Sequence, residues 1–527
     1  MRHRIAFLTS LILASAVVAE AGAQDVRDFH FVKDTTPVLR LSNPAALTAW
    51  SGKVSTVVLE GTKGNGAVVP LEGSANDFSV SASTESFFRL NGKLAFHGAL
   101  FWTDYQGREM GGPVMMNPEL YPVNFMESDP ATVGTKKREN YGLEGALALN
   151  LGSRWALGCG IKYTAGDQTK VKDPRFLNVL MDMNFSCGVT FRASDALLLG
   201  VSLLYRDLLE QVRGGIYGTG DIQYFVQTDK GGFLGSVAEL AGDLNYVPAT
   251  EYRPMANHYY GLSFQALVRE RFSNELSVRY RTGYYGKKAS TSPVFFEYAG
   301  IEADYSGRLL LPAGAGLHRF ALDLGFATLA NDENVLRYVT PAGQSTIVEY
   351  LGKNRVLDRM DMSAVLDYRW YAETSGPRPG LTLGAKAAYA GRMQTTSLFP
   401  LWRKHATHTV SLDLTGQKVW TDGTWSWVMD AGLSGLLGFG TDKLDGTYGS
   451  GETPGLKSFD NYLGRYYEYK TLPRAGASLG FTAARRFGAG FEAFLRVSDA
   501  FDLLLSAPQY LAGRSRNLAC ITLGCNF

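Results

Sequence analysis

Residues 361–370 read DMSAVLDYRW, and their side chains alternate between apolar and polar along the chain. Because successive side chains of a β-strand point to opposite faces, this alternation predicts a strand with one apolar and one polar face. The same period of two recurs at 319–326, at 179–191 and through most of the 527 residues. The sequence therefore predicts an all-β protein. In the first stretch the apolar face consists of Met362, Ala364, Leu366, Tyr368 and Trp370.

Aromatic residues stand where many of the apolar rows begin or end. A soluble sandwich also alternates, with its apolar face in the core, but strands that cross a bilayer place aromatic residues at its two surfaces. The connections between segments also alternate between short and long, which is typical of outer-membrane barrels. We therefore predict a transmembrane antiparallel β-barrel. The aromatic residues at these positions are Trp155, Tyr163, Tyr205, Tyr284, Trp370, Tyr389 and Trp425.

Short polar turns give an estimate of the number of strands. Eight such turns, together with the junction of the two chain ends, predict about 18 strands, with 14 or 16 as alternatives. The turns are expected near Asn91-Gly92, Gly152-Ser153, Ser194-Asp195, Ser273-Asn274, Pro312–Gly316, Ser375–Gly380, Thr421–Gly423 and Gly488–Gly490. Long external loops are expected near 105–139, 207–255, 329–357 and 440–470.

The N-terminus has the composition of a secretory signal peptide. A basic start is followed by the apolar stretch Ile5–Val18 and by the small residues Ala21-Gly22-Ala23. This pattern predicts a signal peptide over residues 1–23 that is removed from the mature protein. Residues 24–52 are then expected to form an N-terminal plug or periplasmic segment. Residues 53–527 are expected to form the barrel.

The C-terminus ends in an apolar row whose last residue is Phe527. A final strand of this kind resembles the signal that the outer-membrane barrel-assembly machinery reads. Together with the signal peptide, it predicts a multi-pass barrel in a bacterial outer membrane. The expected surroundings are outer-membrane lipid and lipopolysaccharide, with a possible protein partner there. The row consists of Ala519, Ile521, Leu523, Cys525 and Phe527.

Composition and motifs argue against several other classes of protein. With 52 basic and 50 acidic side chains, the net charge of +2 gives no electrostatic footprint for nucleic acid. No nucleophile elbow, P-loop or dinucleotide fingerprint stands in its required context. Asp442, Asp445 and Glu452 could contact calcium, but their spacing is not that of an EF-hand, and a solvated loop is favoured. We expect no enzyme activity, no catalytic residues, no cofactor and no metal site.

The four cysteines leave one alternative open. Cys159 and Cys187 fall on the apolar rows of two neighbouring strands, where they are either small hydrophobic residues or a cross-strand disulfide, and the former is favoured. Cys520 and Cys525 are five positions apart, so in an unbroken strand they face opposite sides and cannot form a disulfide.

The polar rows carry charges of both signs that are expected to face the lumen. One interpretation is a hydrated lumen that passes a polar solute. The other is a set of cross-strand ion pairs that brace the wall, and this one is favoured because single-sign ladders would be the sharper mark of ion selectivity. The residues singled out are Arg279, Arg281, Glu302, Asp304, Asp367 and Arg369.

One motif resembles a known family. The stretch Leu41-Ser42-Asn43-Pro44-Ala45-Ala46-Leu47 precedes the first strand. Asn-Pro-Ala at this place resembles the FadL-like superfamily, which includes long-chain fatty-acid transporters and the shuttle barrel of type IX secretion. The layout is also similar to uncharacterised outer-membrane barrels of Bacteroidota, which are Gram-negative bacteria. The resemblance implies that Asn43, Pro44 and Ala45 lie in a plug that occludes the lumen.

Two functions are therefore favoured. One is a FadL-like channel for uptake of a hydrophobic or amphipathic small molecule, although the charged lumen argues against a purely hydrophobic conduit. The alternative is a non-transport partner barrel that docks secreted proteins, surface lipoproteins or a larger transporter through its long loops. A barrel enzyme is the least favoured hypothesis.

Overall fold

The structure is a computed structural model. It describes residues 27–127, 132–218, 223–239, 253–289, 292–374, 376, 378–450, 458–488 and 490–527. The predicted signal peptide at 1–23 lies outside these residues.

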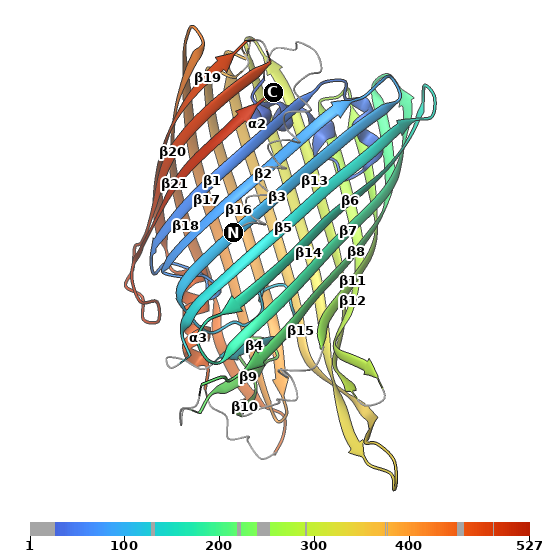
Figure 1. The fold of residues 1–527 in the computed structure, drawn as a ribbon, viewed down its shortest axis with the longest axis vertical. Coiled ribbons are helices and arrows are strands. Elements are labelled where there is room, and N and C mark those ends of the chain that lie inside the picture. Colours follow the sequence, from blue (N-terminus) through green and yellow to red (C-terminus); the bar gives the residue numbers. More distant parts are fainter. Residues whose placement is uncertain are drawn as a thin grey trace.

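Eighteen antiparallel strands form one closed barrel, as the alternation and the turns predict (Figure 1). The barrel closes where β1 (Val54–Gly66) pairs with β21 (Ser515–Asn526). The other strands are β2 (Asn76–Arg89), β3 (Leu94–Met110), β5 (Gly134–Asn150), β6 (Trp155–Lys170), β7 (Arg175–Ser194), β8 (Leu197–Gly215), β11 (Pro254–Val268), β12 (Phe272–Ala289), β13 (Ser292–Ala313), β14 (Gly316–Val339), β15 (Ile347–Ala372), β16 (Leu381–Leu398), β17 (Leu401–Asp422), β18 (Trp425–Thr447), β19 (Arg474–Phe487) and β20 (Phe491–Leu504).

The remaining elements lie between or before these strands. A small three-stranded sheet has the order β10-β9-β4. No helix in the described part of the chain is long and apolar enough to cross a membrane. The elements are α2 (Phe29–Thr35), the 3-10 helices η1 (Pro37–Arg40) and η2 (Pro44–Ala49), β4 (Asn124–Glu127), β9 (Phe225–Asp229), β10 (Gly235–Glu239) and α3 (Asp460–Thr471).

The outer face of the barrel carries an apolar band between two rings of aromatic residues. Near the end with the short turns, Trp425 stacks on Trp427 with ring centroids 5.4 Å apart. Farther along the strands, Tyr205 and Tyr260 meet across a strand pair with centroids 5.4 Å apart. On β6, Trp155 and Tyr163 lie eight positions apart. At about 3.3 Å per residue and a tilt of about 40°, this spacing puts the rings roughly 20 Å apart along the barrel axis.

Seven of the eight predicted turns coincide with a hairpin at one end of the barrel, which we call the short-turn end. The turn predicted near Ser273-Asn274 lies a few residues earlier, because β11 ends at Val268 and β12 begins at Phe272. Arg269 and Glu270 make that turn with φ angles of 50° and 56°. Left-handed positions are usually filled by Gly or Asn, so two charged residues gave no turn signal.

The opposite end, which we call the long-loop end, contains three of the four predicted long loops. The fourth, at 329–357, is wrong because β14 and β15 continue through it and turn at 340–346. Their hairpin extends past the other strands (Figure 1, yellow). Outside the apolar band the strands remain paired although both of their faces are polar. In the sequence, such a polar stretch without alternation looks like a loop. Ion pairs brace the hairpin, as in Arg337–Glu349 at 2.6 Å.

Cys159 and Cys187 lie directly opposite each other on β6 and β7 and form a disulfide. The favoured interpretation of these two as unbonded hydrophobic residues is therefore wrong, and the cross-strand alternative holds. Their register brings the two Cα atoms to 4.3 Å from each other. Cys520 and Cys525 are unbonded, as their spacing predicts.

Candidate functional site

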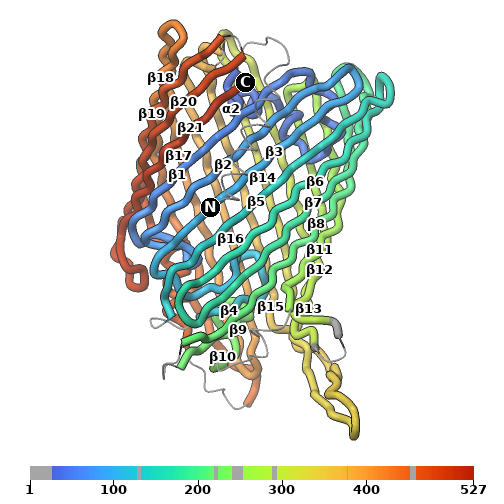
Figure 2. Tube along the Cα trace, viewed as in Figure 1, coloured from blue at the N-terminus to red at the C-terminus, as the bar shows by residue number. Residues whose placement is uncertain are grey.

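The N-terminal segment lies inside the barrel at the short-turn end (Figure 2, dark blue). Its helix η2 contacts β3, β5, β6 and β7, while Asp34 contacts Arg319 and Arg369 on β14 and β15. Because these groups of strands belong to different sides of the wall, the segment must cross the lumen. We call residues 27–52 the plug.

Asn43 anchors the plug to the wall and is 1% exposed. Its Nδ2 donates to the carbonyl oxygens of Val189 and Val201, each at 3.2 Å, and to Oε1 of Gln265 at 3.1 Å. Its Oδ1 accepts from the backbone N–H of Ala45 at 3.0 Å, which caps η2. One side chain thus fixes the helix start and joins it to strands β7, β8 and β11.

Glycines in the wall make room for this anchor. A Cβ atom on Gly188 would lie 2.2 Å from Oδ1 of Asn43, and one on Gly158 would lie 2.3 Å from the backbone nitrogen of Ala45. A Cβ on Gly200 would lie 2.9 Å from Nδ2 of Asn43. Glycine inside a strand often marks a close approach of another backbone. These glycines are therefore the feature of the sequence that could have predicted where the plug contacts the wall.

Ion pairs hold the remainder of the plug. Asp34 lies 2.9 Å from Arg319 and 3.1 Å from Arg369, and it also accepts a hydrogen bond from the hydroxyl of Tyr371. Burial raises the pKa of Asp34, but the charges of these arginines outweigh it and hold the pKa below its usual value. Further contacts are Lys33–Glu85 at 2.6 Å, Arg378–Asp28 at 2.9 Å and the Ser42 N–H to Glu275 at 3.0 Å.

The long-loop end is closed by residues 111–127, which we call the lid loop. The loop turns into the barrel and buries Met115, Met116 and Phe125 in an apolar cluster with Tyr285 and other wall residues. Its last part, β4, pairs with β9, and the small sheet and α3 lie at the same end (Figure 1). Glu127 is fully buried and forms an ion pair with Lys136 at 3.6 Å and with Lys170.

The tip of the lid loop reaches the barrel interior. Arg392, Arg281 and Arg359 donate to the carbonyl oxygens of three consecutive residues, 119, 120 and 121, at 3.2, 2.9 and 3.3 Å. The carboxylate of Glu119 lies 2.7 Å from the ammonium of Lys470 in α3. No motif in the sequence indicated this contact, because Glu119 and Lys470 are far apart in the chain.

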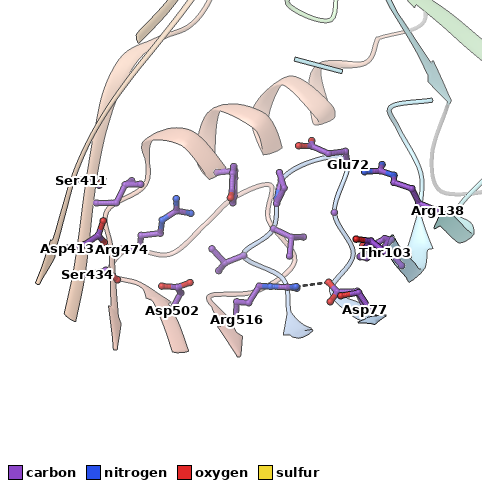
Figure 3. Close-up of a pocket in the computed structure, with 18 of the residues that line it drawn as sticks. Glu72, Asp77, Thr103, Arg138, Ser411, Asp413, Ser434, Arg474, Asp502 and Arg516 are labelled. Atoms are coloured by element: carbon purple, nitrogen blue, oxygen red, sulfur yellow. Dashed lines mark hydrogen bonds and ion pairs between the residues drawn. The ribbon is translucent and has the colours of Figure 1, made fainter. Parts of the chain in front are cut away.

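Three cavities of about 670, 370 and 440 Å³, which we together call the chamber, are lined by the wall strands; the plug also lines the second and the lid loop the third. The largest is lined by charges from opposite walls (Figure 3). Arg516 pairs with Asp77 on one side, at 2.5 Å. Asp502 lies on β20 next to Arg516, and Arg474 and Asp413 lie farther along the wall on β19 and β17; among the described residues none of these three has an ion-pair partner within 4.0 Å. These three side chains are available to a polar solute.

The predicted lumen residues on β12 and β13 form an ion-pair cluster that faces the chamber. Arg279 lies 3.3 Å from Glu302 and also pairs with Asp304. Arg281 is buried and bonds Asn257 and the lid loop instead of a carboxylate. Arg279 and Asp304 line the cavity of about 370 Å³.

The predicted residues on β15 lie beside the plug, and one of them contacts it. Asp367 pairs with Arg319 at 2.8 Å, and Arg369 pairs with Asp34 of the plug at 3.1 Å and with Asp367 at 3.5 Å. Sequence reasoning missed Asp34 and Arg319, since nothing local links them. The predicted plug residues Asn43, Pro44 and Ala45 are all buried against the wall. Phe527 closes the seam by backbone hydrogen bonds with Ser55.

The possible calcium ligands do not form a cluster. Asp445 pairs with Arg403 at 2.7 Å, while the carbonyl of Asp442 lies 2.6 Å from Nδ1 of His405. Glu452 lies outside the described residues. In the ranges that the structure describes, no group of three or more His, Cys, Asp or Glu side chains could hold a metal ion.

Comparisons with known proteins give a family but no activity. The family model DUF6850, described as a family of unknown function, matches residues 44–527. No curated protein matches the sequence.

Three solved structures illustrate the similar folds. A FadL homologue of Pseudomonas aeruginosa is 11% identical, with 92% of this chain and 93% of that chain covered and a TM-score of 0.31. The ferric preacinetobactin receptor BauA of Acinetobacter baumannii is 7% identical, with 91% and 80% covered and a TM-score of 0.40. The RagAB peptide transporter is 10% identical, with 86% and 72% covered and a TM-score of 0.38. At these scores the likeness carries no argument about function.

Proposed function

The chain belongs to the DUF6850 family, whose function is unknown, and we propose that it is an outer-membrane transporter. In this proposal an amphipathic small molecule passes through the chamber. The plug closes one end of the chamber and the lid loop closes the other, and the two ends open alternately. The layout is FadL-like in having a plug with an Asn-Pro-Ala motif inside a barrel. The long-loop end faces outward and the short-turn end faces the periplasm.

The outer face of the barrel supports a location in a membrane. The apolar band between the two aromatic rings is roughly 20 Å tall, close to the ~25 Å of outer-membrane barrels. Leu203, Leu433 and Leu437 stand in this band and are more than 60% exposed. A soluble barrel would leave this large apolar surface in water, which monomeric soluble proteins rarely do.

The closure of both ends around a chamber is the observation that carries the proposal. An 18-stranded barrel is too wide for its own wall side chains to fill. Here the two closures are separate segments that are held by hydrogen bonds and ion pairs, such as Asn43–Gln265 and Glu119–Lys470. A wall that served only as a scaffold would need neither an internal cavity nor two separate segments that close it.

The lining of the chamber favours an amphipathic cargo over a purely hydrophobic one. Leu39, Leu41 and Phe87 line the cavity next to the plug, together with charged side chains such as Arg206 and Arg279. A molecule with an apolar part and a charged or polar head would match both kinds of surface.

Conductance in planar bilayers tests this proposal. The double variant N43G/P44G removes the anchor of the plug, so we expect a higher conductance and faster entry of small solutes into liposomes. The matched control is N354G/P341G, which replaces the same residue types in the β14–β15 hairpin, outside the lumen. Unchanged permeability in N43G/P44G would contradict the proposal, as would an equal rise in the control.

The β14–β15 hairpin favours a second candidate function, a barrel that docks a protein partner. Tyr338, Tyr350 and Leu351 are 52%, 51% and 58% exposed on this projecting hairpin. Gentle purification from the native membrane, followed by mass spectrometry, tests the candidate. A stoichiometric partner that is lost when these three residues become Ser would support docking. Purification of the barrel alone would count against it.

A further inference from the structure

The tip of the lid loop lies in a group of four cationic side chains, which we call the basic cluster. Arg281, Arg359 and Arg392 come from β12, β15 and β16, and Lys470 comes from α3. All four line the cavity of about 440 Å³. The cluster is therefore open to the chamber although the lid loop covers part of it.

Carboxylates satisfy only part of this positive charge. Asp361 is shared by Arg359 at 3.0 Å and Arg392 at 2.6 Å. In the described part of the chain, Arg281 has no carboxylate within 4.0 Å, although its side chain is buried. The Nε of Arg359 makes the 3.0 Å ion pair with Asp361, so the two carboxylates of Asp361 and Glu119 are set against four cationic side chains. Guanidinium groups form stronger hydrogen bonds with anions than with neutral acceptors, so the cluster has unused capacity for an anion.

The lid loop supplies the cluster with its own anion. Burial raises the pKa of Glu119, but Lys470, Arg392 and Arg359 outweigh it and keep the pKa below the usual value. The loop also offers three neutral carbonyls to the arginines. The arrangement has the chemistry of a bound carboxylate that belongs to the protein itself.

We propose that the basic cluster binds the anionic head group of the cargo, a carboxylate or a phosphate, and that Glu119 occupies this site as an internal surrogate until the head group displaces the lid loop. The inference rests on the proposed transport function, which it deepens by naming the class of cargo and the trigger for opening. The neighbouring cavity provides the space in which the head group can exchange with Glu119.

Calorimetry on the full-length protein in a neutral maltoside detergent tests the binding site. The probes are decanoate, decylammonium and inorganic phosphate. We expect decanoate to bind and decylammonium to fail to bind. Because E119Q removes the competing anion and keeps the size of the side chain, its affinity for decanoate should rise about tenfold. The control E349Q breaks the exposed Arg337–Glu349 pair of the hairpin and should bind like the wild type.

A second measurement follows the lid loop directly. In L120C, the rate of modification of the new thiol by a maleimide should rise several-fold when decanoate is added, after subtraction of the native cysteines. R392Q should lose decanoate binding, and R392K should recover part of it. Inorganic phosphate that binds as well as decanoate would support the site and identify a free anion as its ligand. Equal decanoate affinity in E119Q and wild type, or tight binding of decylammonium, would overturn the inference.

The two proposals can fail separately. Tighter decanoate binding in E119Q together with unchanged permeability in N43G/P44G would keep the anion site and refute transport. Raised permeability in N43G/P44G without any decanoate binding would keep the channel and refute the anion site.

Discussion

Substitution of Gly188 by alanine should unseat the plug without any direct change to it. Gly188 lies on β7 opposite the side chain of Asn43, and a Cβ atom there would be 2.2 Å from Oδ1 of Asn43. A contact this short cannot be tolerated, and the backbone of a strand paired on both sides cannot move away easily. Asn43 must therefore withdraw from the wall.

The magnitude follows from the three hydrogen bonds that Asn43 donates to Val189, Val201 and Gln265. The amide nitrogen has two N–H groups to share among these three acceptors, so at about 1 kcal/mol per N–H their loss weakens the seat of the plug by about 2 kcal/mol. This corresponds to a rise of roughly 30-fold in the ratio of unseated to seated plug. The fold should survive, since the substitution adds only one methyl group to a wall of 18 strands.

Two assays check this prediction. In planar bilayers, G188A should show frequent openings that the wild type lacks, and added protease should cut the plug faster. The control is G145A, on β5, where a new Cβ would have no atom within 4 Å. Wild-type conductance and protease resistance in G188A would refute the reasoning, because the plug would then not depend on its contact with this wall position.

Three further changes separate the plug, the wall and the outer face. The lowered pKa of Asp34 contributes stability that is complete above the ordinary carboxyl value of 3.8 and is lost as pH falls through the lowered value. Acidification below the lowered pKa of Asp34 should therefore open the channel. The variant D34N should raise conductance already at neutral pH. Reduction of the Cys159–Cys187 disulfide should lower the melting temperature through a loss of about 2–4 kcal/mol, while conductance stays unchanged. W427A should reduce the stability of the folded barrel in lipid vesicles by about 2 kcal/mol without opening it.

A specific result would contradict each of these three predictions. D34N with wild-type conductance would show that Asp34 does not hold the plug. Raised conductance after reduction of the disulfide would show that this bond helps to keep the channel closed. A W427A barrel of unchanged stability would argue against an aromatic ring at the membrane surface.

Strand pairing was largely predictable because its determinants are local. The period of two along stretches such as 361–370 fixes which side chains face lipid, and Gly- or Asn-containing turns fix where strands reverse. Where local chemistry misleads, prediction fails. Arg269-Glu270 makes a tight turn without the usual residues, and the polar hairpin at 329–357 stays paired in water.

The closures were predictable only in part. The Asn-Pro-Ala motif indicated a plug through its resemblance, but its partners Val189, Val201 and Gln265 come from distant strands. A long loop was predicted near 105–139, but its course into the barrel was not, since the pairing of Glu119 with Lys470 depends on how the loop packs inside the closed barrel. Contacts that arise only after long-range closure cannot be read from spacing along the chain.

The seam between β1 and β21 has a consequence for how far the plug can travel. The last plug helix ends at Ala49 and β1 begins at Val54, so only residues 50–53 join that helix to the wall. A link of this length spans at most about 14 Å, so a folded plug can swing on it but cannot leave the barrel mouth. Its local concentration near the seat stays in the millimolar range. In the proposed transport function, opening is therefore an intramolecular hinge event that reverses without any partner to bring the plug back.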